Sequence, residues 1–303
     1  MIEIFHNPRF DFIGKRKIAV AFSLFFFFGS ILLTIFRGYN YNIDFTGGTE
    51  LQYRFKTAMT EGGLREALDK AGISAEVTTL RGKNLSQPDW LLKIQGGETD
   101  VKGKVRDAIR AAFPAAGDSV LATTTIGARV GKELKRGATW ATIWSAILLL
   151  IYVSVRFELM YAVGAVVATF HDVFFVLFFF SLFQIEFSLT VLAAILTLVG
   201  YSINDTIVVY DRIREQVKKQ RGLPYAQVVN DAINQTLSRT ILTVCTVLFA
   251  VIILLIFGGE TLKTMGIALL IGVITGTYSS IFIAAPILIE WHDRRAAHAA
   301  LSK

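Results

Sequence analysis

The segment from Gly200 to Arg212, GYSINDTIVVYDR, places Asp205 inside an apolar stretch that is long enough to cross a lipid bilayer. A carboxylate at the centre of a membrane costs about 2.5 to 3.5 kcal/mol on insertion scales. A chain that keeps a carboxylate there usually uses it for proton or ion traffic. The sequence therefore predicts a membrane transport component, with Asp205 as its first candidate functional residue.

Composition places the chain among polytopic membrane proteins. Hydrophobic residues make up 53% of the sequence and charged residues only 18%, and the mean hydropathy is +0.52. A soluble globular chain is less apolar than this. Much of the net charge of +7 sits beside apolar blocks, where basic residues set topology and meet anionic lipid, so no nucleic acid partner is expected. The single cysteine, Cys245, excludes an internal disulfide and is expected to be a packing residue.

Six apolar blocks follow one another, each close to the roughly 20 residues that a membrane-spanning helix needs. They cover residues 18–36, 138–155, 159–183, 187–209, 240–257 and 264–289. Basic residues concentrate in the connections on the side of both termini, so the positive-inside rule predicts a cytoplasmic N-terminal segment at 1–17 and a cytoplasmic tail at 290–303. The predicted fold class is an α-helical polytopic membrane protein, in which helix 18–36 is followed, after an intervening domain, by a five-helix bundle over 138–289.

That domain covers residues 37–137 and is predicted to be extracytoplasmic, on the periplasmic side. Strands are expected at 43–55, 75–80, 90–95 and 119–126, and helices at 61–71 and 99–113. The order βαββαβ is that of the small α+β ferredoxin-like fold. The segment contains neither histidine nor cysteine, and its acidic residues are scattered, so the sequence predicts no enzyme there.

Polar residues form one stripe on the fourth predicted helix and one on the fifth. The stripes consist of Thr190, Thr197, Tyr201 and Asp205, and of Thr236, Arg239, Thr243 and Thr246. Both stripes start near the same membrane surface, so Asp205 and Arg239 lie at depths similar enough for pairing. A static ion pair that fixes helix register is the alternative to a functional pair, and Arg239 alone would be a snorkelling anchor.

Two further features lie within the predicted helices. His171 and Asp172, near the middle of the third, either relay protons or bond across helices as structural residues, and the sequence leaves both roles open. Gly272 and Gly276 form a GxxxG pattern on the sixth, with Ser279 close to that face, which indicates close helix packing.

A buried aspartate beside a movable arginine suits a proton carrier. Burial favours the uncharged carboxyl, whereas a nearby guanidinium favours the carboxylate, so a helix movement can load or unload a proton. Each elementary charge that crosses a membrane yields about 2.3 kcal/mol per 100 mV, which can bias a conformational equilibrium. No cofactor is expected besides the proton gradient. Sodium remains an alternative, because a carboxylate with hydroxyls and the Asn204 amide nearby can hold either ion.

Four segments stand out as motifs. They are IDFTGGT at 43–49, HDV at 171–173, GYSINDTIVVYDRIRE at 200–215 and NQTLSRT at 234–240. Together they resemble the characteristic segments of SecF-type members of the SecD/SecF protein-export family, within the resistance-nodulation-division superfamily. The resemblance covers nearly the whole chain. The first motif contributes Asp44, Gly47 and Gly48, although a glycine pair by itself indicates only a turn or a close backbone approach.

The resemblance implies a multi-pass protein of the bacterial cytoplasmic (inner) membrane that uses the proton motive force to promote polypeptide translocation. It implies SecD as the partner that supplies the other half of the bundle, together with the SecYEG translocon, a YajC-like small membrane protein and exported unfolded polypeptide. Asp205 and Arg239 match the family's proton-using positions, with Asn204 beside them. The candidates for relay or packing roles are His171, Asp172, Tyr201 and Thr243.

Other classes of protein are alternatives to this interpretation. A proton-coupled small-molecule transporter of the same superfamily would share the buried carboxylate but would ordinarily be a longer, duplicated chain. An intramembrane aspartyl protease could use Asp172 and Asp205 as a dyad, although the Gly-x-Gly-Asp context of such proteases is missing around both. A metalloprotease or an ATPase is disfavoured because the sequence contains neither His-Glu-x-x-His nor a phosphate-binding loop, so no enzyme is expected.

Overall fold

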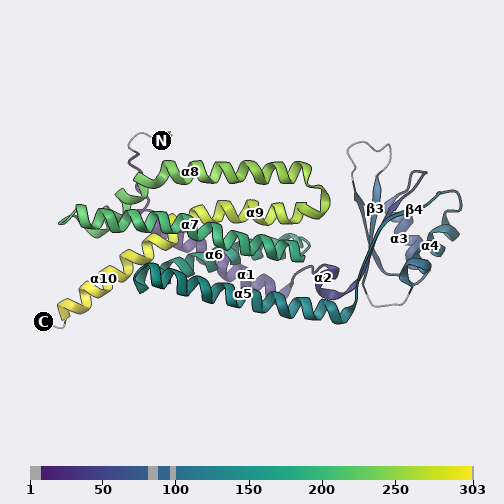
Figure 1. Cartoon of the computed structure of the whole chain (residues 1–303), viewed down its shortest axis with the longest axis horizontal. Helices are drawn as coiled ribbons and strands as arrows, with labels where there is room; N and C mark the ends of the chain where they lie inside the picture. The colour runs from purple at the N-terminus through teal and green to yellow at the C-terminus, as the bar shows by residue number, and fades with distance from the viewer. Residues whose placement is uncertain (1–7, 81–87, 96–99, 302–303) are drawn as a thin grey trace.

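A computed structural model describes residues 8–80, 88–95 and 100–301. It contains a long helical bundle with a small α+β domain at one end (Figure 1). The first helix, α1 (Arg16–Phe36), begins at the opposite end of the bundle, and the last helix, α10 (Ala285–Leu301), ends there (Figure 1). We call this the termini end. The predicted segments 1–17, 99–113 and 290–303 each lie partly outside the described residues.

Six helical segments are long and apolar enough to span a membrane, which confirms the prediction. They are α1, α5 (Ala128–Arg156), α6 (Leu159–Phe183), α7 (Leu189–Lys219), α8 (Tyr225–Phe257), and a final segment that joins α9 (Gly259–Ser279), the π-helical turn η1 (Ser280–Ala284) and α10. Helix α8 has 33 residues, which is about 50 Å at 1.5 Å per residue, whereas a hydrocarbon core is about 30 Å thick. Helices α7 and α8 therefore continue past their apolar blocks at the termini end (Figure 1).

The small domain has the predicted βαββαβ order. After a short helix α2 (Ile43–Thr46) come β1 (Gly48–Arg54), α3 (Glu61–Lys70), β2 (Ala75–Leu80), β3 (Asp89–Gln95), α4 (Val101–Ala112) and β4 (Ser119–Ile126). The strand order is β2-β3-β1-β4 with every neighbouring pair antiparallel, so the ferredoxin-like prediction is confirmed. Helices α3 and α4 lie on one face of the sheet, over a core that includes Leu51, Leu64 and Leu92 (Figure 1).

The strand predicted over 43–55 begins too early, because residues Ile43–Thr46 form a helix. Asn42 accepts a hydrogen bond from the backbone N–H of Ile43 through its side chain, and this cap starts helix α2 instead of a strand. The carboxylate of Asp44 accepts a hydrogen bond from the backbone N–H of Leu189 at 2.9 Å. That N–H is one of the unpaired donors at the start of α7. Asp44 therefore ties the entry to the small domain onto the bundle.

Gly47 and Gly48 turn the chain from α2 into β1 where no side chain fits. Their φ angles are 75° and 152°, values that favour glycine. A Cβ on Gly47 would lie 2.7 Å from Cα of Ala128 at the start of α5, and one on Gly48 would lie 2.4 Å from the carbonyl oxygen of Ile94 in β3. The glycine pair thus lets the first strand, its neighbour and the second membrane helix meet in one place.

We expect Gly48→Ala to destabilise the chain by about 2 to 4 kcal/mol, because the added methyl group meets backbone that cannot move aside. The matched control is Gly62→Ala in α3, where a Cβ has nothing within 4 Å and where alanine should be neutral or stabilising by up to about 1 kcal/mol. Thermal unfolding of both variants in the same detergent measures the difference. Equal melting temperatures would show that the close approach of Gly48 to the backbone of Ile94 does not affect stability.

Candidate functional site

Asp205 lies near the middle of α7 with its side chain inside the bundle, only 7% exposed. Its Oδ1 accepts a hydrogen bond from Oγ1 of Thr240 on α8 at 2.7 Å. Its Oδ2 accepts one from Oγ of Ser280 on η1 at 2.6 Å. The carboxyl therefore joins three helical segments, and its hydroxyl partners replace the water that it lacks.

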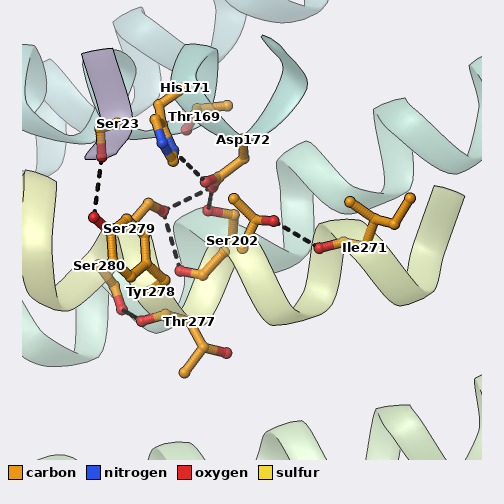
Figure 2. A network of polar contacts seen from close by, with 12 residues as sticks. Ser23, Thr169, His171, Asp172, Ser202, Ile271, Thr277, Tyr278, Ser279 and Ser280 are labelled. Carbon is orange, nitrogen blue, oxygen red and sulfur yellow. Dashed lines mark hydrogen bonds and ion pairs between the residues drawn. The ribbon is translucent and has the colours of Figure 1, made fainter. Parts of the chain in front are cut away.

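Asp172 forms a second polar centre on the neighbouring helix α6, fully buried at 0% exposure (Figure 2). Its Oδ2 accepts hydrogen bonds from Oγ of Ser202 at 2.5 Å and from Oγ of Ser279 at 2.8 Å, and its Oδ1 lies 3.1 Å from Nδ1 of His171. The other ring nitrogen of His171, Nε2, is buried without a partner among the described residues. Asp172 thus connects α6 to α7 and α9, and His171 contacts it from the same helix.

The π-helical turn η1 explains how two adjacent serines reach two different carboxyls. Ser279 ends α9 and donates to Asp172, whereas Ser280 begins η1 and donates to Asp205. π-Helical turns inside α-helices occur frequently at functional sites. Pro286 follows shortly after and has no N–H to donate to the preceding turn. The hydroxyl of Tyr210 on α7 donates to the carbonyl of Ala284 at 3.2 Å and so satisfies a backbone group of the irregular turn.

Glycines let α7 and α9 approach each other beside these serines. A Cβ on Gly276 would lie 3.1 Å from Cβ of Ser202, and one on Gly272 would lie 2.3 Å from a methyl group of Leu198. The predicted packing role of this GxxxG pattern agrees with the geometry. The close approach also brings Ser202 and Ser279 to the same oxygen of Asp172.

Asp205 and Arg239, which were expected to pair, make no direct bond in the described part of the chain. No ion pair within 4.0 Å joins the two among the described residues, although Arg239 is near enough to act on Asp205 by coulombic attraction. The residue that bonds to Asp205 is the next one, Thr240, which is buried, whereas Arg239 is exposed in the isolated chain. Successive residues of a helix point about 100° apart, so α8 can present only one of the two to Asp205.

Several other predicted residues lie on one exposed face of α7 and α8. We call it the polar face and define it by Thr197, Asn204, Arg239, Thr243 and Thr246, all exposed in the isolated chain. The hydroxyl of Tyr201 lies beside Thr243 at the edge of this face. Cys245 is also exposed rather than packed inside the chain. Such polar side chains are costly against lipid and usually face a partner or a water-filled space.

The intramembrane aspartyl protease alternative loses its structural basis in the described part of the chain. No hydrogen bond joins Asp172 to Asp205 there, and each carboxyl has its own set of hydroxyl donors, so the dyad of an aspartyl protease is not formed. The same residues contain no cluster of three histidine, cysteine, aspartate or glutamate side chains that could hold a metal ion.

Comparison with known proteins identifies the family. The family model described as protein export membrane protein SecD/SecF, C-terminal, matches residues 107–294. The protein translocase subunit SecF of Rhodothermus marinus is 40% identical over 310 residues, which cover 99% of this chain and 99% of the relative. The chain belongs to the SecD/SecF protein-export family. Its resemblance to SecF-type sequences, found from four motifs, is thereby confirmed.

Members of the SecD/SecF family also include fused proteins. The protein translocase subunit SecDF of Thermus thermophilus is 37% identical over 97% of this chain, which spans only 40% of that longer relative. A crystal structure of SecDF from Thermus thermophilus, described as a translocon-associated membrane protein, covers 95% of this chain with a TM-score of 0.84 and 37% identity; 39% of that chain is matched. A super-membrane-facing form of SecDF covers 100% of this chain and 41% of its own, with a TM-score of 0.75 and 37% identity.

The sequence alone did not identify the residues of this SecD/SecF family member that hydrogen-bond to the two buried carboxyls. Asp205 and Asp172 were found because charges in apolar segments are conspicuous, whereas Ser202, Thr240 and Ser280 look like ordinary small polar residues. One signal was present: Ser279 and Ser280 precede Pro286 within a single apolar block. A proline inside a long helix predicts an irregular turn, and adjacent hydroxyls near such a turn are candidates for buried hydrogen bonds.

Proposed function

We propose that the chain is a SecF-type subunit that couples the proton motive force to polypeptide export. The observation that supports this most is the Asp205 carboxyl, which is buried and held by the hydroxyls of Thr240 and Ser280. A fixed ion pair would hold the carboxyl in its charged state. A hydroxyl can donate to a carboxylate or accept from a carboxylic acid, so this site accommodates both protonation states.

Ser280 has a second acceptor within reach. Its Oγ lies 2.6 Å from Oδ2 of Asp205 and 3.0 Å from the carbonyl oxygen of Thr277. When Asp205 is ionised, the Ser280 hydroxyl donates to it. When Asp205 is protonated, Ser280 turns its proton toward Thr277 and accepts from the carboxylic acid. Protonation thereby changes the hydrogen bonding of the π-helical turn, and we propose that this turn is the element that moves.

Arg239 supplies the charge that favours proton release. It lies outside hydrogen-bonding distance of Asp205 but within coulombic reach. A small shift of α8 against α7 that brings the guanidinium closer stabilises the carboxylate, and a shift away stabilises the acid. Asn204, Tyr201 and Thr243 are proposed to line the route between them and to hold the water that carries the proton. His171 and Asp172 are proposed to keep the helices in register behind this site.

A SecD-type chain is the proposed partner on the polar face. Five polar side chains are exposed there in membrane-spanning helices, and burial against a second half-bundle would remove them from lipid. Fused SecDF relatives contain a matching region that makes up only about 40% of their length. The remaining length of those proteins leaves room for such a second half.

The proposed setting is the bacterial cytoplasmic membrane, with the termini end in the cytoplasm and the small domain outside. The basic residues of the termini end support this orientation. The domain is proposed to handle exported unfolded polypeptide leaving the SecYEG translocon, with a YajC-like small protein nearby. This role is conformational, so the chain needs no catalytic group and no cofactor besides the ion gradient.

Protons are proposed as the coupling ion. Export by the complete complex in proteoliposomes should respond to an imposed pH gradient and stay unchanged when sodium is replaced by potassium on both sides. This prediction follows because the hydroxyls of Thr240 and Ser280 can bond to both the ionised and the protonated carboxyl of Asp205, so a proton alone can change the charge of the site. Stimulation by a sodium gradient at zero pH difference would instead assign the site to sodium.

A further inference from the structure

A groove of about 970 Å³ runs along the surface of the bundle between α1, α6 and the η1–α10 segment. It lies away from the polar face, because none of its lining residues comes from α7 or α8. Its walls are mostly apolar and include Val20, Leu24, Val167 and Phe170, each between 42% and 49% exposed. Exposed apolar side chains along a groove in a membrane-spanning bundle are suited to lipid acyl chains.

The groove has the length of one membrane leaflet. On α1 its lining runs from Arg16 to Phe27, which is about 17 Å at 1.5 Å per residue. Half of a hydrocarbon core of about 30 Å is about 15 Å. The groove therefore begins at the termini end and reaches about as far as the acyl chains of the leaflet on that side.

The mouth of the groove is positively charged. Arg16 is partly buried and Lys17 is exposed there, and neither makes an ion pair among the described residues. The one acidic lining residue, Glu290, is paired with Arg294 at 2.8 Å. Two cations thus stand where the headgroup of a lipid would lie, and basic pockets between membrane helices bind anionic headgroups.

A buried polar atom deeper in the groove lacks a hydrogen-bond partner in the described part of the chain. His171 lines the groove, is only 6% exposed, and uses Nδ1 toward Asp172. Its Nε2 has no partner among the described residues. In either tautomer this nitrogen requires a hydrogen bond when buried. A water molecule held in the groove can supply it.

We propose that this groove binds one anionic phospholipid of the leaflet at the termini end, with the phosphate at Arg16 and Lys17 and an acyl chain against α1 and α6. The inference goes beyond the proposed export role and does not depend on it. The bound lipid fills the space between α1 and the segment that carries η1.

Native mass spectrometry of the full chain in a mild detergent tests the proposal. Phosphatidylglycerol and phosphatidylcholine with the same acyl chains are the probes. We expect the wild type to retain one phosphatidylglycerol with about tenfold preference over phosphatidylcholine. Arg16→Gln combined with Lys17→Gln should reduce this preference to about threefold or less, because the charge that selects the headgroup is gone.

Two matched variants make the result specific. Lys218→Gln with Arg221→Gln removes the same charge at the same end, on and after α7 rather than at the groove, and should leave the preference intact. Val20→Trp fills the groove and should lower retention of both lipids, while an unchanged melting temperature shows that the fold persists. The proposal is overturned if both double variants lose the preference equally, if the wild type does not discriminate between the lipids, or if Val20→Trp still retains phosphatidylglycerol.

Discussion

Asp205→Asn is expected to abolish the gradient-dependent part of polypeptide export while assembly and ATP-driven translocation stay intact. Asparagine keeps the volume of the side chain and can still bond to Thr240 and Ser280, but it cannot take up or release a proton. The measurement compares export into vesicles that contain the complete complex, with and without a proton motive force. We expect export by the variant to be the same with and without the gradient.

The control for this result is Asp211→Asn. Asp211 lies on the same helix but is exposed, and within the described part of the chain its one ion pair is a long contact of 3.4 Å with Arg156. Exposed ion pairs of this kind contribute little to stability, about 0 to 1 kcal/mol, so this variant should export as the wild type does. If Asp205→Asn keeps its full response to the gradient, the carboxyl is a structural residue and the proposed carrier role is wrong.

Ser280→Ala is expected to reduce gradient-driven export by about 10- to 100-fold, second only to loss of the carboxyl. Hydrogen bonds to charged groups contribute about 1.5 to 3 kcal/mol, and this one is also proposed to transmit the protonation state to the π-helical turn. Ser280→Thr keeps the hydroxyl and should restore most of the activity. The assay is the same vesicle system, with melting temperature measured alongside.

Thr275→Ala is the matched control for Ser280→Ala. Thr275 is buried on the same membrane-spanning segment, and its hydroxyl donates only to the backbone carbonyl of Ile271, at 2.7 Å. Thr275→Ala loses a hydrogen bond to a neutral carbonyl, which is about 1 kcal/mol of stability, whereas Ser280→Ala loses one to a carboxyl, which is about 1.5 to 3 kcal/mol when that group is charged. Only Ser280→Ala should lose the response to the gradient. Equal activity losses would mean that the serine acts through stability alone.

Much of the fold could be predicted from the sequence because membranes impose strong rules. Six apolar blocks gave six spanning helices, and the βαββαβ pattern gave the correct type of small domain. Helix ends were predicted less well, since α7 and α8 extend as amphipathic helices beyond their apolar parts. The strand predicted at 43–55 failed at its start because a local cap by Asn42 outweighed the strand propensity of Ile43 and Phe45.

The charged residues of the candidate site could be predicted from the sequence, but their hydrogen-bond partners could not. An aspartate in an apolar segment can be recognised as a candidate from the sequence, because placing a carboxylate in a membrane is costly and such residues are usually functional. Which neighbour bonds to it depends on helix rotation, and a rotation of about 100° separates Arg239 from Thr240. Periodicity alone places residues on a face but does not orient two helices toward each other. The π-helical turn that brings Ser280 to Asp205 shifts the helical register locally, and a regular period of 3.6 residues cannot anticipate that shift.

Infrared difference spectroscopy of the reconstituted complex tests the central claim most directly, because the difference between the spectra of the wild type and Asp205→Asn isolates the protonation of one carboxyl. The spectrum of the wild type on a step from acidic to alkaline medium should contain a carboxylic acid C=O band that disappears as a carboxylate band appears. The same bands should be missing in Asp205→Asn and shifted in Ser280→Ala, since Ser280 bonds to that carboxyl. Identical difference spectra for the wild type and Asp205→Asn would contradict the account.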